Sequence, residues 1–146
     1  MPLPSFNEDG DLPLGIHQAT LSEILDRFGA GTARRKVLGR RLERIYHLAH
    51  GTGHLARFVI FGSFITAKLE PNDVDVFLLM EDTFDITQLT GESRLVFEHA
   101  VAQDYFGCSV FWLRRLAVLG DERSAISRWQ IKRNGTRRGV VEIISE

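Results

Sequence analysis

Two acidic residues and a Gly-Ser pair are the groups in this sequence best suited to chemistry. Asp73 and Asp75 are separated by one residue and open an apolar run, whereas Gly62 and Ser63 close the apolar run before it. Side chains alternate between the two faces of a strand, so both carboxylates are expected on the same face. Two like charges this close favour a bound cation, and Mg²⁺ prefers carboxylate oxygens combined with phosphate oxygens.

Gly62 and Ser63 complement the carboxylates. Glycine lets a ligand or another backbone segment approach closely, and a helix that began at Ser63 would direct its free N–H groups toward a phosphate. Lys68, which lies between the two patterns, is a candidate nucleotide-binding residue that could meet a triphosphate, or else an ordinary solvated lysine. The pattern as a whole indicates two buried strands with polar binding groups at their junctions.

The order of these features supplies a further clue. An apolar run, Gly-Ser, nine residues and then Asp-x-Asp at the start of a second apolar run resembles the signature of the polymerase-β-like nucleotidyltransferase superfamily. Residues 12–20 and 129–144 are also similar to a small, poorly characterised bacterial branch of nucleotidyltransferase-like proteins. The resemblance implies the minimal fold of that superfamily, in which strands flank both halves of the signature.

The resemblance also implies roles for the residues of the signature. Asp73 and Asp75 would be catalytic and would hold Mg²⁺, or Mn²⁺ in its place. Gly62 and Ser63 would bind the triphosphate of a nucleoside triphosphate. A hydroxyl group on an unidentified protein, RNA or small molecule would then attack the α-phosphorus.

Two features depart from the pattern of the superfamily. The strand expected at residues 108–113 usually supplies a third carboxylate, but Ser109, or else Cys108, takes that place here, and the nearest upstream acid is Asp104. Two-metal catalysis of phosphoryl displacement needs enough negative ligands, and a serine hydroxyl is a weak replacement. In addition, the bulky residues 64–67 follow Gly-Ser, where many active minimal transferases have an arginine or a second glycine.

Capping signals and apolar spacing predict the helices that position these groups. Thr20 and Glu23 form a capping box, and Gly29 ends the short helix that it begins. Thr32 can cap a second helix, in which apolar residues recur at steps of three and four. A third helix is expected over residues 91–104.

Asn-Gly at positions 134–135 predicts a tight β-hairpin near the end of the sequence, because both turn positions accept positive φ. The flanking stretches 127–133 and 136–144 would add two antiparallel strands to the sheet. The predicted fold class is therefore α/β (α+β), with a mixed, mainly antiparallel sheet and helices packed largely on one side.

Two basic clusters accompany these elements. Arg40 and Arg44 lie on the polar side of the second predicted helix, and a second cluster surrounds the hairpin turn: Lys132, Arg133, Arg137 and Arg138. Each cluster is either a surface that binds RNA, nucleotide phosphates or an acidic partner protein, or an ordinary solvated helix face or protected edge strand. An RNA-binding module would require both clusters to share one face.

Bulk composition indicates one globular domain over residues 1–146, with residues 1–14 as a loosely held, extended arm. The sequence has 44% hydrophobic and 25% charged residues, a formal charge of −1 and one cysteine, Cys108, which excludes an intramolecular disulfide. No apolar run is long enough to span a bilayer, and the first residues do not read as a signal peptide, so a cytoplasmic location without membrane attachment is expected.

The preferred interpretation is Mg²⁺-dependent transfer of a nucleoside monophosphate from a nucleoside triphosphate to an unidentified hydroxyl acceptor. The intact Asp-x-Asp pattern favours this enzyme. The absent third carboxylate favours an alternative, in which a degenerate relative binds a nucleotide or a partner protein without chemistry, for example in a toxin–antitoxin or defence system. An RNA-binding module is the third alternative.

Overall fold

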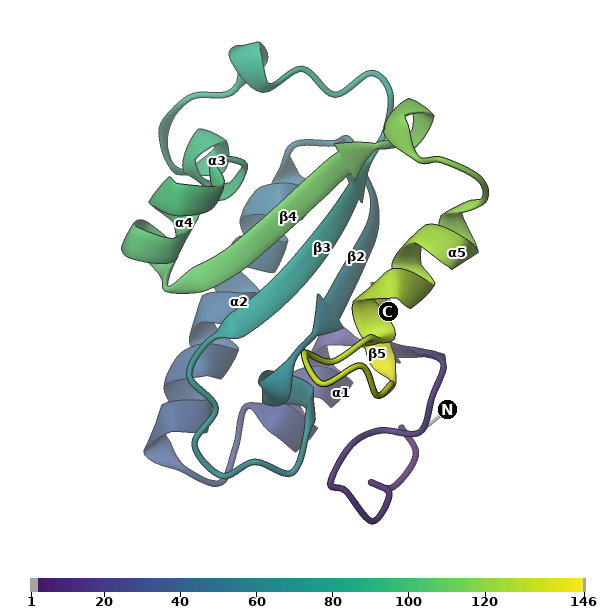
Figure 1. Ribbon diagram of the computed structural model, residues 1–146. Coiled ribbons are helices and arrows are strands. Elements are labelled where there is room, and N and C mark those ends of the chain that lie inside the picture. Colours follow the sequence, from purple (N-terminus) through teal and green to yellow (C-terminus); the bar gives the residue numbers. More distant parts are fainter. Residues whose placement is uncertain (1–2, 146) are drawn as a thin grey trace.

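The computed structural model describes residues 3–145 and confirms an α+β fold, with five α-helices and one five-stranded mixed sheet in this range (Figure 1). The strands are β1 (Ile16–Thr20), β2 (Leu55–Phe61), β3 (Val74–Met80), β4 (Cys108–Arg114) and β5 (Val140–Ile144). The helices are α1 (Leu21–Phe28), α2 (Ala33–Gly51), α3 (Gly91–Val96), α4 (His99–Phe106) and α5 (Glu122–Ser127).

The sheet has the strand order β1-β5-β2-β3-β4, so the strand that comes last in sequence lies between two earlier ones. The two central pairings, β5 with β2 and β2 with β3, are antiparallel. The two outer pairings, β1 with β5 and β3 with β4, are parallel. The mixed sheet predicted from the sequence is thus confirmed. It is not mainly antiparallel, because two of its four strand pairings are parallel.

The helices lie largely on one side of the sheet, as predicted. Buried side chains of α1, α2, α3 and α4 join one large core with one face of β2, β3, β4 and β5. On the opposite face, α5 and Trp129 cover a smaller cluster that contains Val59, Phe77 and Leu79. Figure 1 shows α5 separated by the sheet from α2. This second face is only partly covered, and it is the face on which the candidate site lies.

Most predicted helix boundaries are confirmed. Thr20 and Glu23 form the capping box of α1, Gly29 is its C-cap, and the Thr32 side chain accepts from the Arg35 N–H at the start of α2. The prediction of a single helix over residues 91–104 is wrong, because this range contains two helices, α3 and the first part of α4. Phe97 breaks it: its ring packs against Phe84 and Trp112, and its carbonyl accepts a hydrogen bond from the Trp112 indole at 2.9 Å.

The prediction of a loosely held N-terminal arm is also wrong for residues 3–14. Residues 1–2 lie outside the described part of the chain. Asp11 and Leu12 are buried, and the Phe6 ring lies 6.1 Å from that of Phe28. The arm is tied to two distant segments, since the Gly10 carbonyl accepts from Ala67 N–H at 2.8 Å and the Leu12 carbonyl from Gly139 N–H at 2.9 Å. It continues directly into β1, a strand that the sequence analysis missed.

The predicted hairpin near the end of the chain is only partly present. A turn forms around Gly135, whose φ is +85°, but the only bridge beside it pairs Ile131 with Arg137. Residues 128–130 form a 3-10 turn instead of a strand, because Trp129 packs on the sheet and the buried Gln130 side chain accepts from the Gly15 N–H at 2.6 Å. The sheet therefore gains one strand here, β5, and residues 131–138 form a loop.

Candidate functional site

The strand register brings the acidic pair, Gly62 and Ser109 to one end of the sheet. Asp75 of β3 lies opposite Phe61, the last residue of β2, and also opposite Ser109 of β4. Asp73 immediately precedes β3, and Ser109 Oγ donates to its Oδ2 at 3.4 Å. The structure thus brings together Asp73, Asp75 and Gly62, as predicted, and puts Ser109 at the position expected for a third carboxylate.

Gly62 leaves room for the Asp75 carboxylate. Its φ is +83° and its ψ is −166°, a backbone conformation almost restricted to glycine. A Cβ atom at this position would overlap Asp75 Oδ2 and lie 3.1 Å from its Cγ. A glycine is therefore needed here both for the backbone turn and for the close approach of the carboxylate.

The segment after Gly62 is a short turn and not the start of an α-helix. Ser63–Ile65 is a single 3-10 turn, and the Ser63 carbonyl accepts from both the N–H and the hydroxyl of Thr66. No α-helix begins at Ser63, so this segment does not offer a phosphate the N-terminus of an α-helix. The buried side chains of Phe64 and Ile65 turn the chain back into the core.

Arg35 of α2 holds this segment in place. Its guanidinium is buried and donates to four backbone carbonyls, those of Phe28, Phe64, Thr66 and Lys68. Hydrogen bonds from a charged group are stronger than neutral ones, and a buried cation without them would be costly. Arg35 thus has a structural role, which depends on partners that are distant in sequence and so could not be predicted from it.

A cleft lies over the acidic pair. It consists of two adjoining hollows of about 440 and 420 Å³, both lined by Gly62, Asp73, Asp75, Lys132, Arg133 and Arg138. Ser63 and Lys68 line the first hollow with Gly62, so all three predicted nucleotide-binding residues are at the cleft. Arg137 is absent from the lining and instead borders a separate hollow beside α5.

The buried carboxylate of Asp11 anchors the loop of residues 131–138, the basic loop, to the N-terminal arm. It forms ion pairs with Lys132 and, at 3.5 Å, with Arg138. Asp11 itself is only 4% exposed, so its charge is directed at these two partners. Nothing in the local sequence around Asp11 indicates this role, because its partners are more than a hundred residues away.

Electrostatics within the cleft favour a bound cation. Burial and the nearby charge of Asp73 raise the pKa of Asp75 to about 6 from its ordinary value of 3.8. A hydrogen bond from Ser109 and the positive charges of Arg138 and Arg133 oppose this rise. A divalent cation would balance the negative charge of Asp73 and Asp75 that the protein leaves uncompensated, since carboxylate oxygens are ligands that Mg²⁺ prefers.

The residues present fit a cation that shares its ligands with a substrate. Among residues 3–145, no group of three or more His, Cys, Asp or Glu side chains is placed to hold a metal ion. Ser109, at the third position, is neutral and also accepts a hydrogen bond from the Gln103 amide at 3.1 Å. Asp73 and Asp75 could therefore hold Mg²⁺ only with further oxygens, such as those of a phosphate.

Arg40 and Arg44 of α2 do not line the cleft. Helix α2 packs on the opposite face of the sheet from Asp75 and the 131–138 loop. Arg44 pairs with Glu92, and its guanidinium lies 5.6 and 5.3 Å from the ring centroids of Tyr105 and Phe106. The structure therefore does not join Arg40 and Arg44 to the basic residues of the 131–138 loop.

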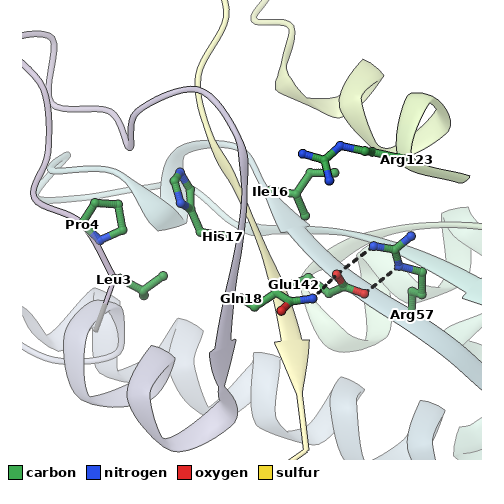
Figure 2. A pocket seen from close by; sticks show the side chains of 8 residues that line it. All are labelled: Leu3, Pro4, Ile16, His17, Gln18, Arg57, Arg123 and Glu142. Carbon is green, nitrogen blue, oxygen red and sulfur yellow. Dashed lines mark hydrogen bonds and ion pairs between the residues drawn. The ribbon is translucent and has the colours of Figure 1, made fainter. Parts of the chain in front are cut away.

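A fourth hollow, of about 610 Å³, lies between the N-terminal arm, β1 and α5 (Figure 2). On its floor, Arg57 donates to both oxygens of Glu142 at 2.7 and 2.9 Å, and Gln18 Nε2 donates to Oε1 at 3.4 Å. Burial alone would raise the pKa of Glu142, but these hydrogen bonds and the Arg57 charge outweigh it and lower the pKa. This network joins β1, β5 and β2, so we assign it a structural role.

Together, the fold and the site define an α+β protein in which two carboxylates and a basic loop border one open cleft. The chain belongs to a family of proteins of unknown function (DUF6932), whose sequence profile matches residues 4–144. No curated protein and no solved structure matches the chain. Within the described residues, none of the helices is both long and apolar enough to cross a membrane.

Replacing Gly62 with alanine should destabilise the fold more than the same change at Gly53. Both glycines have positive φ, but a Cβ at Gly53 meets open space. Gly53→Ala should lower the free energy of unfolding by about 1–2 kcal/mol through backbone strain alone. Gly62→Ala should cost about 1–3 kcal/mol more, because overlap with the carboxylate adds to the strain. Urea denaturation measures the free energy of unfolding of both variants. Equal losses of stability would contradict the close approach of the Asp75 carboxylate to Gly62.

Asp75→Asn should stabilise the metal-free protein at neutral pH. Between the ordinary pKa of 3.8 and the folded pKa of about 6, the folded state binds more protons than the unfolded state. The free energy of unfolding contributed by Asp75 therefore falls as the pH rises through this window. The variant should exceed wild type by about 1–3 kcal/mol above pH 7, and this difference should disappear near pH 4.

Urea denaturation in the presence of a chelator, at several pH values, measures this effect. The control is Asp104→Asn, which removes an exposed carboxylate of α4. If Asp75→Asn were less stable than wild type at neutral pH, the Asp75 carboxylate would be stabilised in the folded protein, and the prediction would be wrong.

Proposed function

We propose that this protein binds a nucleoside triphosphate with Mg²⁺ in the cleft and transfers the nucleoside monophosphate to a hydroxyl acceptor. The observation that carries this proposal is the lining of one cleft by two carboxylates and four cationic side chains, Lys68, Lys132, Arg133 and Arg138. Carboxylates alone suit many cations, and cations alone suit many anions. A polyphosphate with its metal ion needs both.

Each part of the cleft has a role in this proposal. Asp73 and Asp75 would hold Mg²⁺ together with phosphate oxygens, and Arg133 and Arg138 would bind the terminal phosphates, because guanidinium groups match phosphate in geometry and charge. Lys68 lines the hollow on the same side and would add a further charge. Bound Mg²⁺ would supply charge neutralisation and polarisation at the phosphate that is attacked.

Sequence and topology give further support. The Gly-Ser and Asp-x-Asp pattern resembles the polymerase-β-like superfamily signature, and here it lies at adjacent ends of two paired strands. The Gly62 conformation and the Asp75 approach explain physically why the pattern needs a glycine. A cytoplasmic location belongs to the same proposal, because the substrate is a cytoplasmic metabolite. The acceptor can be a protein, an RNA or a small molecule.

The proposal predicts Mg²⁺-dependent binding that the acidic pair controls. Calorimetric titration of each nucleoside triphosphate should give binding with Mg²⁺ and little without it. The Asp73→Asn, Asp75→Asn double variant should bind at least about 100-fold more weakly, since each lost charged ligand is worth about tenfold or more. Pyrophosphate leaves when the α-phosphorus bonds to the acceptor hydroxyl, or to water where no acceptor is present. Its release, measured in the same samples, should disappear with the binding.

The charge-matched control is the Asp26→Asn, Asp104→Asn double variant, which removes two exposed carboxylates from α1 and α4. It should bind like wild type. Equal weakening in both double variants would show a general charge effect, and absence of binding in wild type would contradict the proposal.

Binding without turnover is the second candidate function, and Ser109 is the observation that favours it. The hydroxyl lies where the superfamily strand carries a carboxylate, and it is buried and already engaged with Gln103 and Asp73. A site with two carboxylates can still hold one metal ion and a triphosphate. It would then present a bound nucleotide to a partner protein instead of transferring it.

Ser109→Asp separates these two candidates. A third carboxylate beside Asp73 and Asp75 should raise Mg²⁺ affinity by about tenfold or more, because ligand charge count governs the affinity of such sites. The control is Ser109→Asn, which has a similar size and no charge. Pyrophosphate release by Ser109→Asp alone would identify wild type as a binding protein, whereas release by wild type would establish it as an enzyme.

The RNA-binding alternative has less support. It required the α2 cluster and the cluster of residues 132–138 to share a face, and the sheet lies between them. An RNA strand contacting both clusters would have to pass around an edge of the sheet.

A further inference from the structure

The second hollow of the cleft has an aromatic wall that the proposed chemistry does not use. Phe61, Phe111, Trp129 and the His99 imidazole line it beside the acidic pair. Phe111 is 37% exposed and Ile131 is 50% exposed, although both belong to the lining of a hollow. Large apolar surface left open next to a charged site favours a ligand that is itself partly flat and apolar.

The rings of this wall support one another. The Trp129 ring stacks on Phe61 with a centroid distance of 4.5 Å, and Phe111 lies 5.0 Å from Trp129 and 4.6 Å from His99. His99 Nδ1 donates to the Val110 carbonyl at 3.0 Å, which fixes the plane of the imidazole. Because the rings are already held, a planar ligand that stacks on Phe111 would order few further side chains.

The two hollows share the acidic pair and the cations of the 131–138 loop, and they differ in the rest of their lining. Cationic and polar groups dominate the first, with Ser63 and Lys68, whereas the second adds the aromatic wall. A nucleoside triphosphate likewise has a charged part and a flat aromatic part, and its α-phosphate joins the terminal phosphates to the sugar and base. With the α-phosphate at Asp73 and Asp75, the terminal phosphates occupy the first hollow and the base reaches the second.

We infer that the aromatic hollow is the nucleobase subsite, where the base of the nucleoside triphosphate stacks on Phe111 between His99 and Ile131. This inference rests on the proposed function, since it assumes that a triphosphate occupies the other hollow. It assigns a specific role to residues 99, 111 and 131, which lie outside the Gly-Ser and Asp-x-Asp pattern.

The test compares Mg-ATP with Mg-triphosphate, which carries the same phosphates and no base. Phe111→Ala should weaken Mg-ATP binding by about 5- to 150-fold, the range measured for loss of one base–aromatic stack, and should leave Mg-triphosphate binding unchanged. Phe111→Leu, which keeps apolar bulk without a ring, should behave similarly. Unchanged Mg-triphosphate binding shows that each variant is folded.

Leu113→Ala is the matched control. Leu113 lies two residues further along β4 on the same face, is 40% exposed, and does not line the cleft. It should bind both probes like wild type. Mg-ATP should also change the tryptophan fluorescence, Mg-triphosphate should not, and Trp129→Phe should abolish the change while Trp112 remains.

The outcomes separate the two proposals. Wild-type affinity of Phe111→Ala for Mg-ATP, with normal binding of Mg-triphosphate, would overturn the base subsite and leave the triphosphate site standing. Equal weakening of both probes by Phe111→Ala would assign that residue a structural role and also overturn the subsite. Failure of wild type to bind either probe would overturn the proposed function and the subsite with it.

Discussion

Two carboxylates held side by side at the end of a sheet repel each other, and much of the surrounding structure limits the cost of that repulsion. Asp75 is partly buried beside Asp73, and its raised pKa of about 6 measures how incompletely the protein compensates the charge. The backbone at Gly62 turns so that the carboxylate can fit. The neighbouring strand offers a hydroxyl at Ser109 in place of a third negative charge. The arrangement is stable enough to fold and polarised enough to attract a cation.

The positive charge opposite this pair comes from segments far away in the sequence. Lys132 and Arg138 lie on a loop without regular structure, and the buried Asp11 carboxylate gives that loop a fixed position. Asp11 can do so because the N-terminal arm is itself held by backbone hydrogen bonds to residues 67 and 139. The arm, the basic loop and the Gly-Ser turn therefore form one connected layer around the cleft, with Arg35 supporting it from the helical side.

Local sequence patterns predicted most of the elements but little of how the cleft is enclosed. Caps at Thr20 and Thr32, the apolar strands and the Asp-x-Asp placement depend on neighbours a few residues away, so the sequence carries them directly. The split at Phe97 depends on Trp112, and the lost hairpin strand depends on Trp129 packing against the sheet; both contacts are tertiary. The roles of Asp11 and Arg35 likewise depend on distant partners. Propensity and spacing contain no information about such pairs.

The position of β5 links the order of synthesis to the assembly of the cleft. β5 follows every other described strand in sequence, yet it lies between β1 and β2 and pairs with both. Until residues 140–144 leave the ribosome, β1 lacks its partner and one edge of β2 stays open, a state that invites wrong pairing. The 131–138 loop immediately precedes β5, so the cations reach the acidic pair in the same step that completes the sheet. A nascent chain therefore carries the acidic pair without the cations of the 131–138 loop until β5 joins the sheet.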